Sequence, residues 1–489
     1  MFNLFRETLT FDDVLLIPKY SEVIPSQVDT KSLFVKDIYL KVPFISAAMD
    51  TVTESEMAKA MAREGGVGII HKNMSIDEQV HEVVKVKRAE NGVIYDPITI
   101  GPKMPVFEAE KIMQEYRIGG LPVVDKEGKL LGILTNRDIR FERNSRKLVS
   151  ELMTPYKDLI VAGVKTGIDE AKEILHINKI EKLPIVDDNQ KIAGLITIKD
   201  VMSVIEHPFA SRDKKGRLLV GAAIGVSDGV ERAKKLIEAS VDVLVLDSAH
   251  GHSMNIIQTL KKIKSLFPET PVIAGNVATK EGAADLINAG ADAIKVGIGP
   301  GSICTTRIIA GIGVPQLTAI SDVYEVAKTY KIPVIADGGI RYSGDAVKAL
   351  AAGANTIMMG SIFAGTDEAP GETIIYQGRK FKTYRGMGSI SAMKKGSKDR
   401  YFQADVEDAE KLVPEGVEGM VDYKGGVKDV IYQLVGGVKS GMGYVGAENI
   451  TQLVEKAEFI KISSAGVKES HPHDITITKE SPNYYYPGK

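Results

Sequence analysis

Eight short apolar segments alternate with amphipathic stretches over most of this 489-residue chain, and this alternation limits the fold more than any other feature. Stretches such as 229–240, 279–289 and 343–352 separate the segments and have helical periodicity. Continuous apolar strands joined by helices are typical of parallel sheets, and eight such units favour a closed barrel over an open doubly wound sheet. We therefore predict an α/β fold, a (β/α)₈ TIM barrel. Its strands are expected at 44–49, 67–71, 219–224, 243–247, 272–276, 293–297, 334–338 and 356–360.

A tandem repeat interrupts this pattern after the second predicted strand. The sequence LPVVD at Leu121 returns as LPIVD at Leu183, and GILT at Gly132 returns as GLIT at Gly194, each 62 residues later (183 − 121). Two copies of this length indicate a paired module and not a solenoid. We predict an inserted α+β pair, with one repeat at 94–152 and the other at 153–207, in a catalytic barrel formed by 1–93 and 208–489.

The composition argues against several classes of protein. Lys and Arg number 62 against 64 Asp and Glu, so charge gives no general reason to expect nucleic acid or a membrane as a partner. No apolar run approaches the ~18 residues of a membrane span, and the N-terminus lacks a signal-peptide core. The single cysteine cannot form an intramolecular disulfide, which fits a reducing compartment. We expect a cytoplasmic enzyme.

The loop after the sixth predicted strand carries that cysteine. Gly297, Gly299 and Gly301 alternate before Cys304, and they allow a shaped backbone that a ligand or ion can approach closely. A nearby cation such as Arg307 would favour the thiolate. Because the active sites of such barrels lie at the carboxyl ends of the strands, we predict that Cys304 is a nucleophile. The alternative is a small buried hydrophobic residue.

Short glycine-containing segments follow the last two predicted strands. Gly338-Gly339 and Gly360-Ser361 fit the phosphate cup that such barrels often build there, which predicts a phosphorylated substrate. Asp337 is a candidate ligand for ribose hydroxyls or, alternatively, a cap for the next helix. Asp247 would suit a second ligand. No GxGxxG opens a helix after a strand, so a nicotinamide cofactor would bind the barrel face itself.

A glycine- and charge-rich stretch, 388–399, leads to Arg400-Tyr401-Phe402. Its length and composition predict a mobile loop or lid. The alternative for the arginine and the aromatic residues is simple exposure on the surface.

Four motifs of the barrel can be read together: the cysteine loop Gly299-Pro300-Gly301-Ser302-Ile303-Cys304-Thr305-Thr306-Arg307, Asp337-Gly338-Gly339-Ile340-Arg341, Tyr384-Arg385-Gly386-Met387-Gly388-Ser389 and Arg400-Tyr401-Phe402. With them, the chain resembles the inosine-5′-monophosphate (IMP) dehydrogenase family over nearly its whole length, and the repeat resembles a cystathionine-β-synthase-type (CBS) pair. The cysteine loop is less specific, because GMP reductases share it.

The resemblance implies a mechanism in two halves. Cys304 attacks C2 of the purine, and the adduct gives a hydride to NAD⁺, leaving a covalent thioimidate. The lid then closes, and Arg400, helped by Tyr401, activates the water that releases xanthosine monophosphate. Thr306 is the fourth implied catalytic residue. An arginine base is chemically surprising, because a guanidinium is normally protonated.

The resemblance also implies binding residues. Those for IMP are Ser302, Asp337, Gly338, Gly339, Gly360, Ser361, Tyr384, Arg385, Gly386, Met387, Gly388 and Glu415. Those for NAD are Asp247, Ser248, Asn276, Gly297, Ile298 and Gly299. A potassium ion is implied on carbonyls of Gly299, Gly301 and Cys304 and on Glu469, Ser470 and His471 of a neighbouring subunit, which requires an oligomer, usually a tetramer and possibly an octamer through the CBS pairs. Alternatively, His471 and His473 are read as a transition-metal site.

The CBS pair is similar to adenine-nucleotide sensors, with Arg137 and Lys199 placed to meet phosphate; the alternative is a packing module without a ligand. Two other functions compete with IMP oxidation. The first is GMP reductase, against which the CBS insertion and the lid residues Arg400 and Tyr401 both argue. The second is a catalytically silent nucleotide sensor.

Overall fold

The computed structural model describes residues 6–89, 94, 97–116, 118–142, 146–401, 403, 406 and 408–484. Internal contacts divide the chain into two compact units. Unit 1 comprises Met1–Lys87, Phe209–Ser211 and Leu218–Lys489, and unit 2 comprises Arg88–Pro208 and Arg212–Arg217. Each unit is described by itself.

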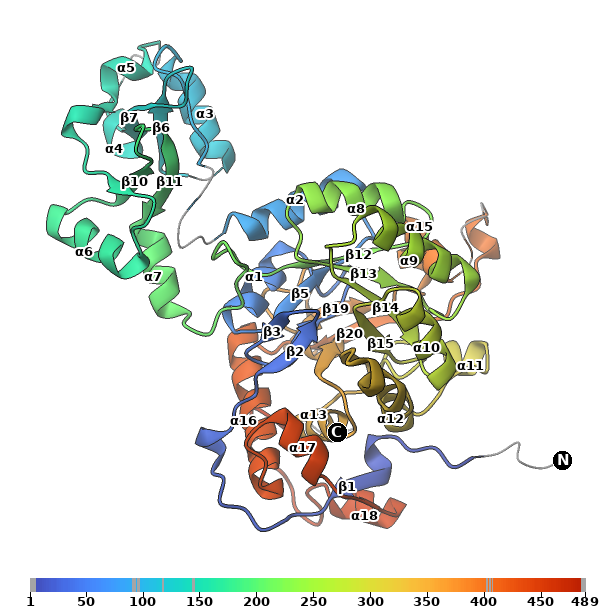
Figure 1. Ribbon diagram of the computed structural model, residues 1–489. Coiled ribbons are helices and arrows are strands. Elements are labelled where there is room, and N and C mark those ends of the chain that lie inside the picture. The colour runs from blue at the N-terminus through green and yellow to red at the C-terminus, as the bar shows by residue number, and fades with distance from the viewer. Residues whose placement is uncertain are drawn as a thin grey trace. The chain divides into compact units, whose positions relative to one another are not determined.

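Unit 1 is built on a closed barrel of eight parallel strands, which confirms the predicted fold class (Figure 1). All eight predicted segments contribute a strand. In barrel order the strands are β12 (Gly221–Ile224), β13 (Val243–Asp247), β14 (Val272–Val277), β15 (Ala293–Val296), β16 (Val334–Asp337), β17 (Thr356–Met359), β4 (Phe44–Ser46) and β5 (Val67–Ile70).

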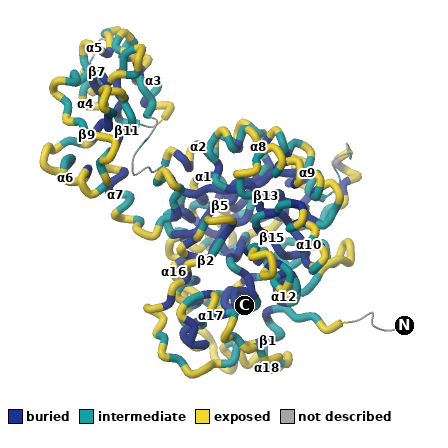
Figure 2. Tube along the Cα trace, in the orientation of Figure 1, coloured by how far each residue is buried: buried dark blue, intermediate teal, exposed yellow. Residues whose placement is uncertain are grey.

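The barrel strands are buried on both faces, as their continuous apolar sequences require (Figure 2). Side chains such as Ile45, Ile69 and Val245 fill the barrel interior without exposure. Most helices that follow the strands bury one face, as Ala233 and Leu236 show on α8, but the short helix Thr306–Ile309 has no buried residue. These helices are α1 (Ser55–Arg63), α2 (Ile76–Lys87), α8 (Gly229–Glu238), α9 (Met254–Leu266), α10 (Lys280–Asn288), α11 (Thr306–Ile309), α12 (Gln316–Ala327), α13 (Ser343–Ala351) and α14 (Ser361–Ala364).

A three-stranded antiparallel sheet follows the barrel and was not predicted. Its strands are β18 (Thr373–Tyr376), β19 (Arg379–Arg385) and β20 (Glu418–Asp422), in that order. Strand β19 presents the predicted substrate residues Tyr384 and Arg385 at its end. The sheet thus brings the segment after residue 372 back to the barrel mouth, where Arg385 lies beside Thr51.

The predicted lid differs from a simple loop. Residues 390–395 form helix α15 (Ile390–Lys395), whose first turn is capped by the Ser389 hydroxyl. Gly396 ends the helix at φ 151°, and residues 397–401 continue as the 3₁₀-helix η5 (Ser397–Tyr401). The predicted lid therefore contains a short helix, which a serine cap and a glycine stop define, and its mobility stays a prediction.

The C-terminal part of unit 1 is mainly helical and joins the chain's beginning. It comprises α16 (Val427–Val445), α17 (Ile450–Lys456), β21 (Phe459–Lys461) and α18 (Ser464–Glu469). Strand β1 (Val14–Leu16) pairs antiparallel with β21, and β2 (Ser32–Val35) pairs with β3 (Ile38–Leu40).

Unit 2 consists of two similar halves, as the repeat predicts. Equivalent positions 62 residues apart are buried in both halves, as Ala109 and Ala171 show. The first half contains α3 (Val106–Tyr116), β6 (Gly120–Val124), β7 (Leu130–Thr135), α4 (Asn136–Ile139), α5 (Val149–Leu152) and β8 (Thr154–Pro155). The second contains β9 (Ala162–Gly163), α6 (Ile168–Asn178), β10 (Lys182–Val186), β11 (Ile192–Thr197) and α7 (Ile198–Glu206).

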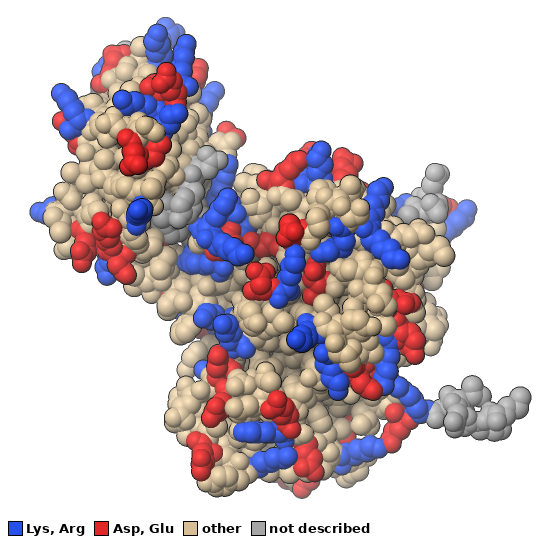
Figure 3. Space-filling view, in the orientation of Figure 1, with Lys and Arg blue, Asp and Glu red and all other residues tan. Residues whose placement is uncertain are grey.

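The surface carries both signs of charge. On the face shown in Figure 3, basic and acidic side chains are interspersed, in keeping with a net charge of −2. Among the described residues, every helix is too short or too polar to cross a bilayer.

Candidate active site

The cysteine loop joins β15 to α11 and has the unusual backbone that its glycines predict. Gly297 and Gly299 have φ of 147° and 78°, and a Cβ on Gly297 would lie 2.2 Å from the carbonyl oxygen of Asp337. Arg307 holds the loop from within. Its Nε donates to the carbonyl of Ile298 (3.2 Å) and its Nη2 to that of Val314 (2.6 Å), so the guanidinium shapes the loop in addition to placing a positive charge near the thiol.

Cys304 stands at the start of a chain of hydrogen bonds. Its thiol donates to the hydroxyl of Thr306 (Sγ–Oγ1 3.2 Å), and this hydroxyl donates to the carboxylate of Glu415 (2.7 Å). The backbone fixes the same arrangement, since the amide of Thr305 donates to the carbonyl of Glu415 (2.9 Å). The arrangement provides a path by which the thiol proton can reach a carboxylate.

A buried lysine organises the ends of three neighbouring strands. Lys295 of β15 donates to Asp247 of β13 (2.9 Å), to Asp337 of β16 (2.8 Å) and to the side-chain oxygen of Asn276 on β14. The Lys295 side chain is 2% exposed, so its charge depends on these partners. Asn276 in turn donates to Asp337 (2.9 Å) and to the carbonyl of Gly297 (2.8 Å).

Asp337 does not cap the following helix, which was the alternative role. The first turn of α13 is capped by Asp345, which accepts from the amides of Arg341 (3.0 Å) and Tyr342 (3.2 Å). Asp337 is instead bound by Lys295 and remains 20% exposed at the strand end. One carboxylate oxygen is therefore placed to accept from a ligand.

The lid residues lie in the barrel mouth. Arg400 is 15% exposed and forms an ion pair with Asp247, and its carbonyl accepts from the amide of Ala249 (3.2 Å). Tyr401 packs on Gly388, where an added Cβ would lie 2.7 Å from the tyrosine ring. Burial raises the pKa of the Tyr401 phenol, and the charges of Arg400, Cys304 and Glu415 all act on it. Phe402 lies outside the described residues.

The substrate loop after β19 is anchored by its own side chains. The Tyr384 phenol hydrogen-bonds Ser302 of the cysteine loop, and burial raises its pKa. Arg385 forms an ion pair with the buried Asp50 and donates to Ser391 (2.9 Å). The guanidinium of Arg385 is therefore committed to Asp50, so a contact with substrate at this position would come from the backbone.

The first glycine pair of the predicted phosphate cup takes backbone conformations that favour glycine, whereas Gly360 has an ordinary φ of −103°. Gly338 and Gly339 have φ of 92° and 83°, and a Cβ on Gly338 would lie 3.0 Å from Pro300. At Gly360 a Cβ would lie 2.6 Å from the Tyr384 hydroxyl. Gly338 and Gly339 thus lie against the cysteine loop, and Gly360 lies against Tyr384.

The three C-terminal residues predicted for a shared cation belong to the end of α18 and the turn after it. Within one chain, the Ser470 hydroxyl donates to the carbonyl of Gly466 (2.7 Å), and His471 Nδ1 lies 2.9 Å from the Tyr484 hydroxyl. The centre of the His471 ring lies 6.2 Å from that of Tyr342. As for the transition-metal alternative, the described part of the chain contains no group of three His, Cys, Asp or Glu residues that could hold a metal.

Lys295 and Asp50 were missed from the sequence. Lys295 did leave a signal, since a lysine within an otherwise apolar buried strand requires acidic partners. Asp50, in the segment after β4, left no such signal, because its partner Arg385 is 335 residues away in the chain.

The chain is similar to known proteins over nearly its whole length. The family model for the IMP dehydrogenase / GMP reductase domain matches residues 8–473. The chain belongs to this family. Among curated proteins, the inosine-5′-monophosphate dehydrogenase of Helicobacter pylori is 59% identical over 483 residues, covering 99% of this chain and 100% of the relative. That of Bacillus subtilis is 58% identical, and one from Streptococcus pyogenes 59%, both with 98% coverage of each chain.

A solved member of the family is a GMP reductase of Trypanosoma brucei in complex with guanosine 5′-monophosphate. It is 42% identical, with a TM-score of 0.87, and the match covers 97% of this chain and 99% of that chain. Coverage this high includes the inserted repeat. The insert therefore does not distinguish an IMP dehydrogenase from a GMP reductase, contrary to the sequence-based expectation.

Proposed function

We propose that the chain oxidises IMP to xanthosine 5′-monophosphate with NAD⁺ through a covalent intermediate on Cys304. The observation that carries this proposal is the placement of Arg400 and Tyr401 at the mouth that holds Cys304, because a covalent intermediate must be hydrolysed there. The 59% identity to proteins named inosine-5′-monophosphate dehydrogenase supports it.

The first half of the reaction starts at the cysteine. The thiol proton passes through the Thr306 hydroxyl to Glu415, and the sulfur adds to C2 of the purine. The hydrogen on C2 then departs as a hydride, for which NAD⁺, when bound, supplies the two-electron acceptor. For the base, Glu415 and backbone groups of Tyr384 to Gly388 would orient C2 toward the sulfur.

The second half requires water at the same carbon. We assign the placement and activation of this water to Arg400, helped by Tyr401. Burial raises the pKa of Tyr401, so its phenol remains a hydrogen-bond donor near neutral pH. Arg400 is paired with Asp247. Once Glu415 has released the thiol proton to solvent, its carboxylate can accept the water's proton through Thr306, and the same path returns a proton to the departing sulfur of Cys304.

The proposed binding sites follow from the strand ends. Gly338, Gly339, Gly360 and Ser361 would bind the phosphate, with Asp337 accepting from ribose hydroxyls and Ser302 beside it. Asp247, Ser248, Asn276, Gly297, Ile298 and Gly299 would line the nicotinamide side. Since Arg400 is already paired with Asp247, the lid and NAD⁺ compete for the same surface.

A potassium ion fits the chemistry of the cysteine loop. Backbone carbonyl oxygens are hard ligands of the kind that such cations prefer. Gly299 has a positive φ, a backbone conformation that lets an ion come close to the loop. Carbonyls of Gly299, Gly301 and Cys304 would hold the ion, which would order the loop. Glu469, Ser470 and His471 would complete the site from another subunit, so we propose a homotetramer, with octamers through the inserted pair.

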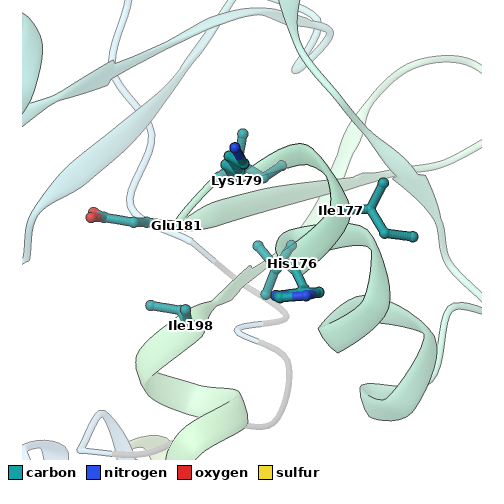
Figure 4. A pocket seen from close by; sticks show the side chains of 7 residues that line it. His176, Ile177, Lys179, Glu181 and Ile198 are labelled. Carbon is teal, nitrogen blue, oxygen red and sulfur yellow. The ribbon is translucent and has the colours of Figure 1, made fainter.

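For unit 2 we propose an adenine nucleotide as ligand. Cationic side chains from both halves gather there: Arg137 and Lys199 act on Lys182, whose pKa is lowered, mainly by burial. Beside them a hollow offers apolar walls for a base (Figure 4), lined by Leu175, His176, Ile177, Lys179, Ile180, Glu181 and Ile198. Equilibrium dialysis with ADP tests this, and no binding would favour a packing module instead.

Absorbance at 340 nm tests the proposed activity directly. NADH should appear when the protein is mixed with IMP and NAD⁺. If NADPH is consumed with GMP instead, the chain is a GMP reductase. If neither pair of substrates reacts, the catalytically silent sensor is the correct reading.

A further inference from the structure

An ion pair that the proposed chemistry does not use fixes the lid to the barrel directly before Arg400. Lys72, in the segment after β5, donates to Asp399 of η5 with an Nζ–Oδ1 distance of 2.5 Å. The two side chains are 9% and 11% exposed. The other carboxylate oxygen of Asp399 accepts from Ser227, in the segment after β12 (3.3 Å). Two barrel loops therefore hold the residue directly before Arg400.

The same barrel segment also holds the base of the lid. Asn73, which follows Lys72, donates to the carbonyl of Ala392 in α15 (3.3 Å) and to Asp50 (2.7 Å). A Cβ on Gly396, where the lid turns at φ 151°, would lie 3.1 Å from the Asn73 side-chain oxygen. Lys72 and Asn73 thus contact the lid on both sides of its turning point.

Removing one member of such a pair has a predictable sign. An ion pair that is almost fully excluded from solvent is weakly screened by salt. Deleting one of its charges leaves the other charge desolvated and without that partner. Opening the lid would return Asp399 to water and relieve that cost. A variant without Lys72 should therefore shift the lid toward its open position and displace Arg400 from Asp247.

We propose that Lys72 and Asp399 form a catch that holds the lid closed for the hydrolytic half of the reaction. The inference rests on the proposed function, since it assigns the catch to one of its two halves. Both side chains are positioning residues, acting through Arg400 and Tyr401. Hydride transfer, which needs the lid away from Asp247, should not depend on the catch.

Rapid mixing with IMP and NAD⁺ separates the two halves. In Lys72→Met and Asp399→Asn we expect the initial burst of NADH at parental rate, followed by steady-state turnover about ten-fold slower or more. The double variant should be no slower than the slower single variant, because the two side chains act as one pair. Lys72→Arg should recover most of the turnover.

Inhibition by excess NAD⁺ gives a second readout. The NAD⁺ concentration that inhibits would not change if Lys72 and Asp399 had only a structural role. Because NAD⁺ and the closed lid compete for the surface at Asp247, catch variants should be inhibited at about ten-fold lower NAD⁺ concentration. Gly225→Ala tests this without removing a charge. Its Cβ would lie 2.5 Å from Asp399 Oδ2 and 2.9 Å from Lys72 Nζ, which forces the pair apart, and Gly225 does not have a positive φ.

The control is Lys280→Met, which removes an ion pair with Glu325 whose side chains are 40% and 61% exposed, and it should behave like the parent. Parental turnover in both Lys72→Met and Gly225→Ala would overturn the catch. So would a raised KM for IMP in Lys72→Met alone, since it would place Lys72 at the substrate. If the parent itself forms no NADH from IMP and NAD⁺, the proposed function fails instead, whereas NADH formation without a burst in the parent would overturn the catch, because hydrolysis would then not limit turnover.

Discussion

Replacing Cys304 with alanine is expected to lower kcat for IMP oxidation by about 10⁴-fold or more, because the substitution removes the nucleophile of the first half-reaction and with it the covalent intermediate that the second half hydrolyses. The affinity for IMP should remain within a few-fold of the parent, since phosphate and ribose contacts belong to other strand ends. Steady-state NADH formation and calorimetric titration with IMP measure the two quantities. Parental turnover in this variant would remove Cys304 from the chemistry.

The single cysteine supplies a control for that variant. Because the chain has one thiol, iodoacetamide can add one label to the parent and none to Cys304→Ala. IMP should slow the labelling if the thiol faces the bound nucleotide. Labelling at an unchanged rate with saturating IMP would place the thiol outside the substrate site.

Replacing Lys295 with methionine is expected to damage both stability and activity. The substitution leaves Asp247 and Asp337 without their shared cation at the strand ends. Breaking a buried pair in this way costs about 3–5 kcal/mol, so the melting temperature of the barrel should fall by several degrees. We expect kcat/KM to fall by about 100-fold or more, since the two carboxylates serve the nicotinamide and ribose sides.

Lys264→Met is the matched control, because it also removes a partly buried ion pair. Lys264 donates to Asp292 (2.7 Å), which lies directly before β15 and so at the amino end of the barrel strands. This variant should melt at a lower temperature but retain parental kcat at 25 °C. Parental melting and kcat in Lys295→Met would contradict the role of the lysine.

Features that depend on neighbours in the chain could be predicted from the sequence. The barrel strands could be predicted because both of their faces are buried and their apolar runs are continuous. The two halves of unit 2 could be predicted because equivalent residues such as Leu121 and Leu183 are buried in each. The backbone of the cysteine loop could be predicted because Gly297 and Gly299 adopt conformations that favour glycine.

Contacts between distant strand ends could not be predicted. Lys72 and Asp399 are separated by 327 residues, and the sequence around either residue does not indicate the other as its partner. The sheet formed by β18, β19 and β20 was missed for a different reason. All four residues of β18 are exposed, so the strand lacks the apolar alternation by which a half-buried strand is detected.

The covalent intermediate on Cys304 is the central claim, and the mass of the intact protein tests it most directly. After mixing with IMP and NAD⁺ and quenching with acid, the parent should gain the mass of IMP less two hydrogen atoms, one lost as hydride and one as the thiol proton. Peptide mapping should place this mass on Cys304, and samples without NAD⁺ should lack it. NADH formation with an unchanged protein mass would contradict the account.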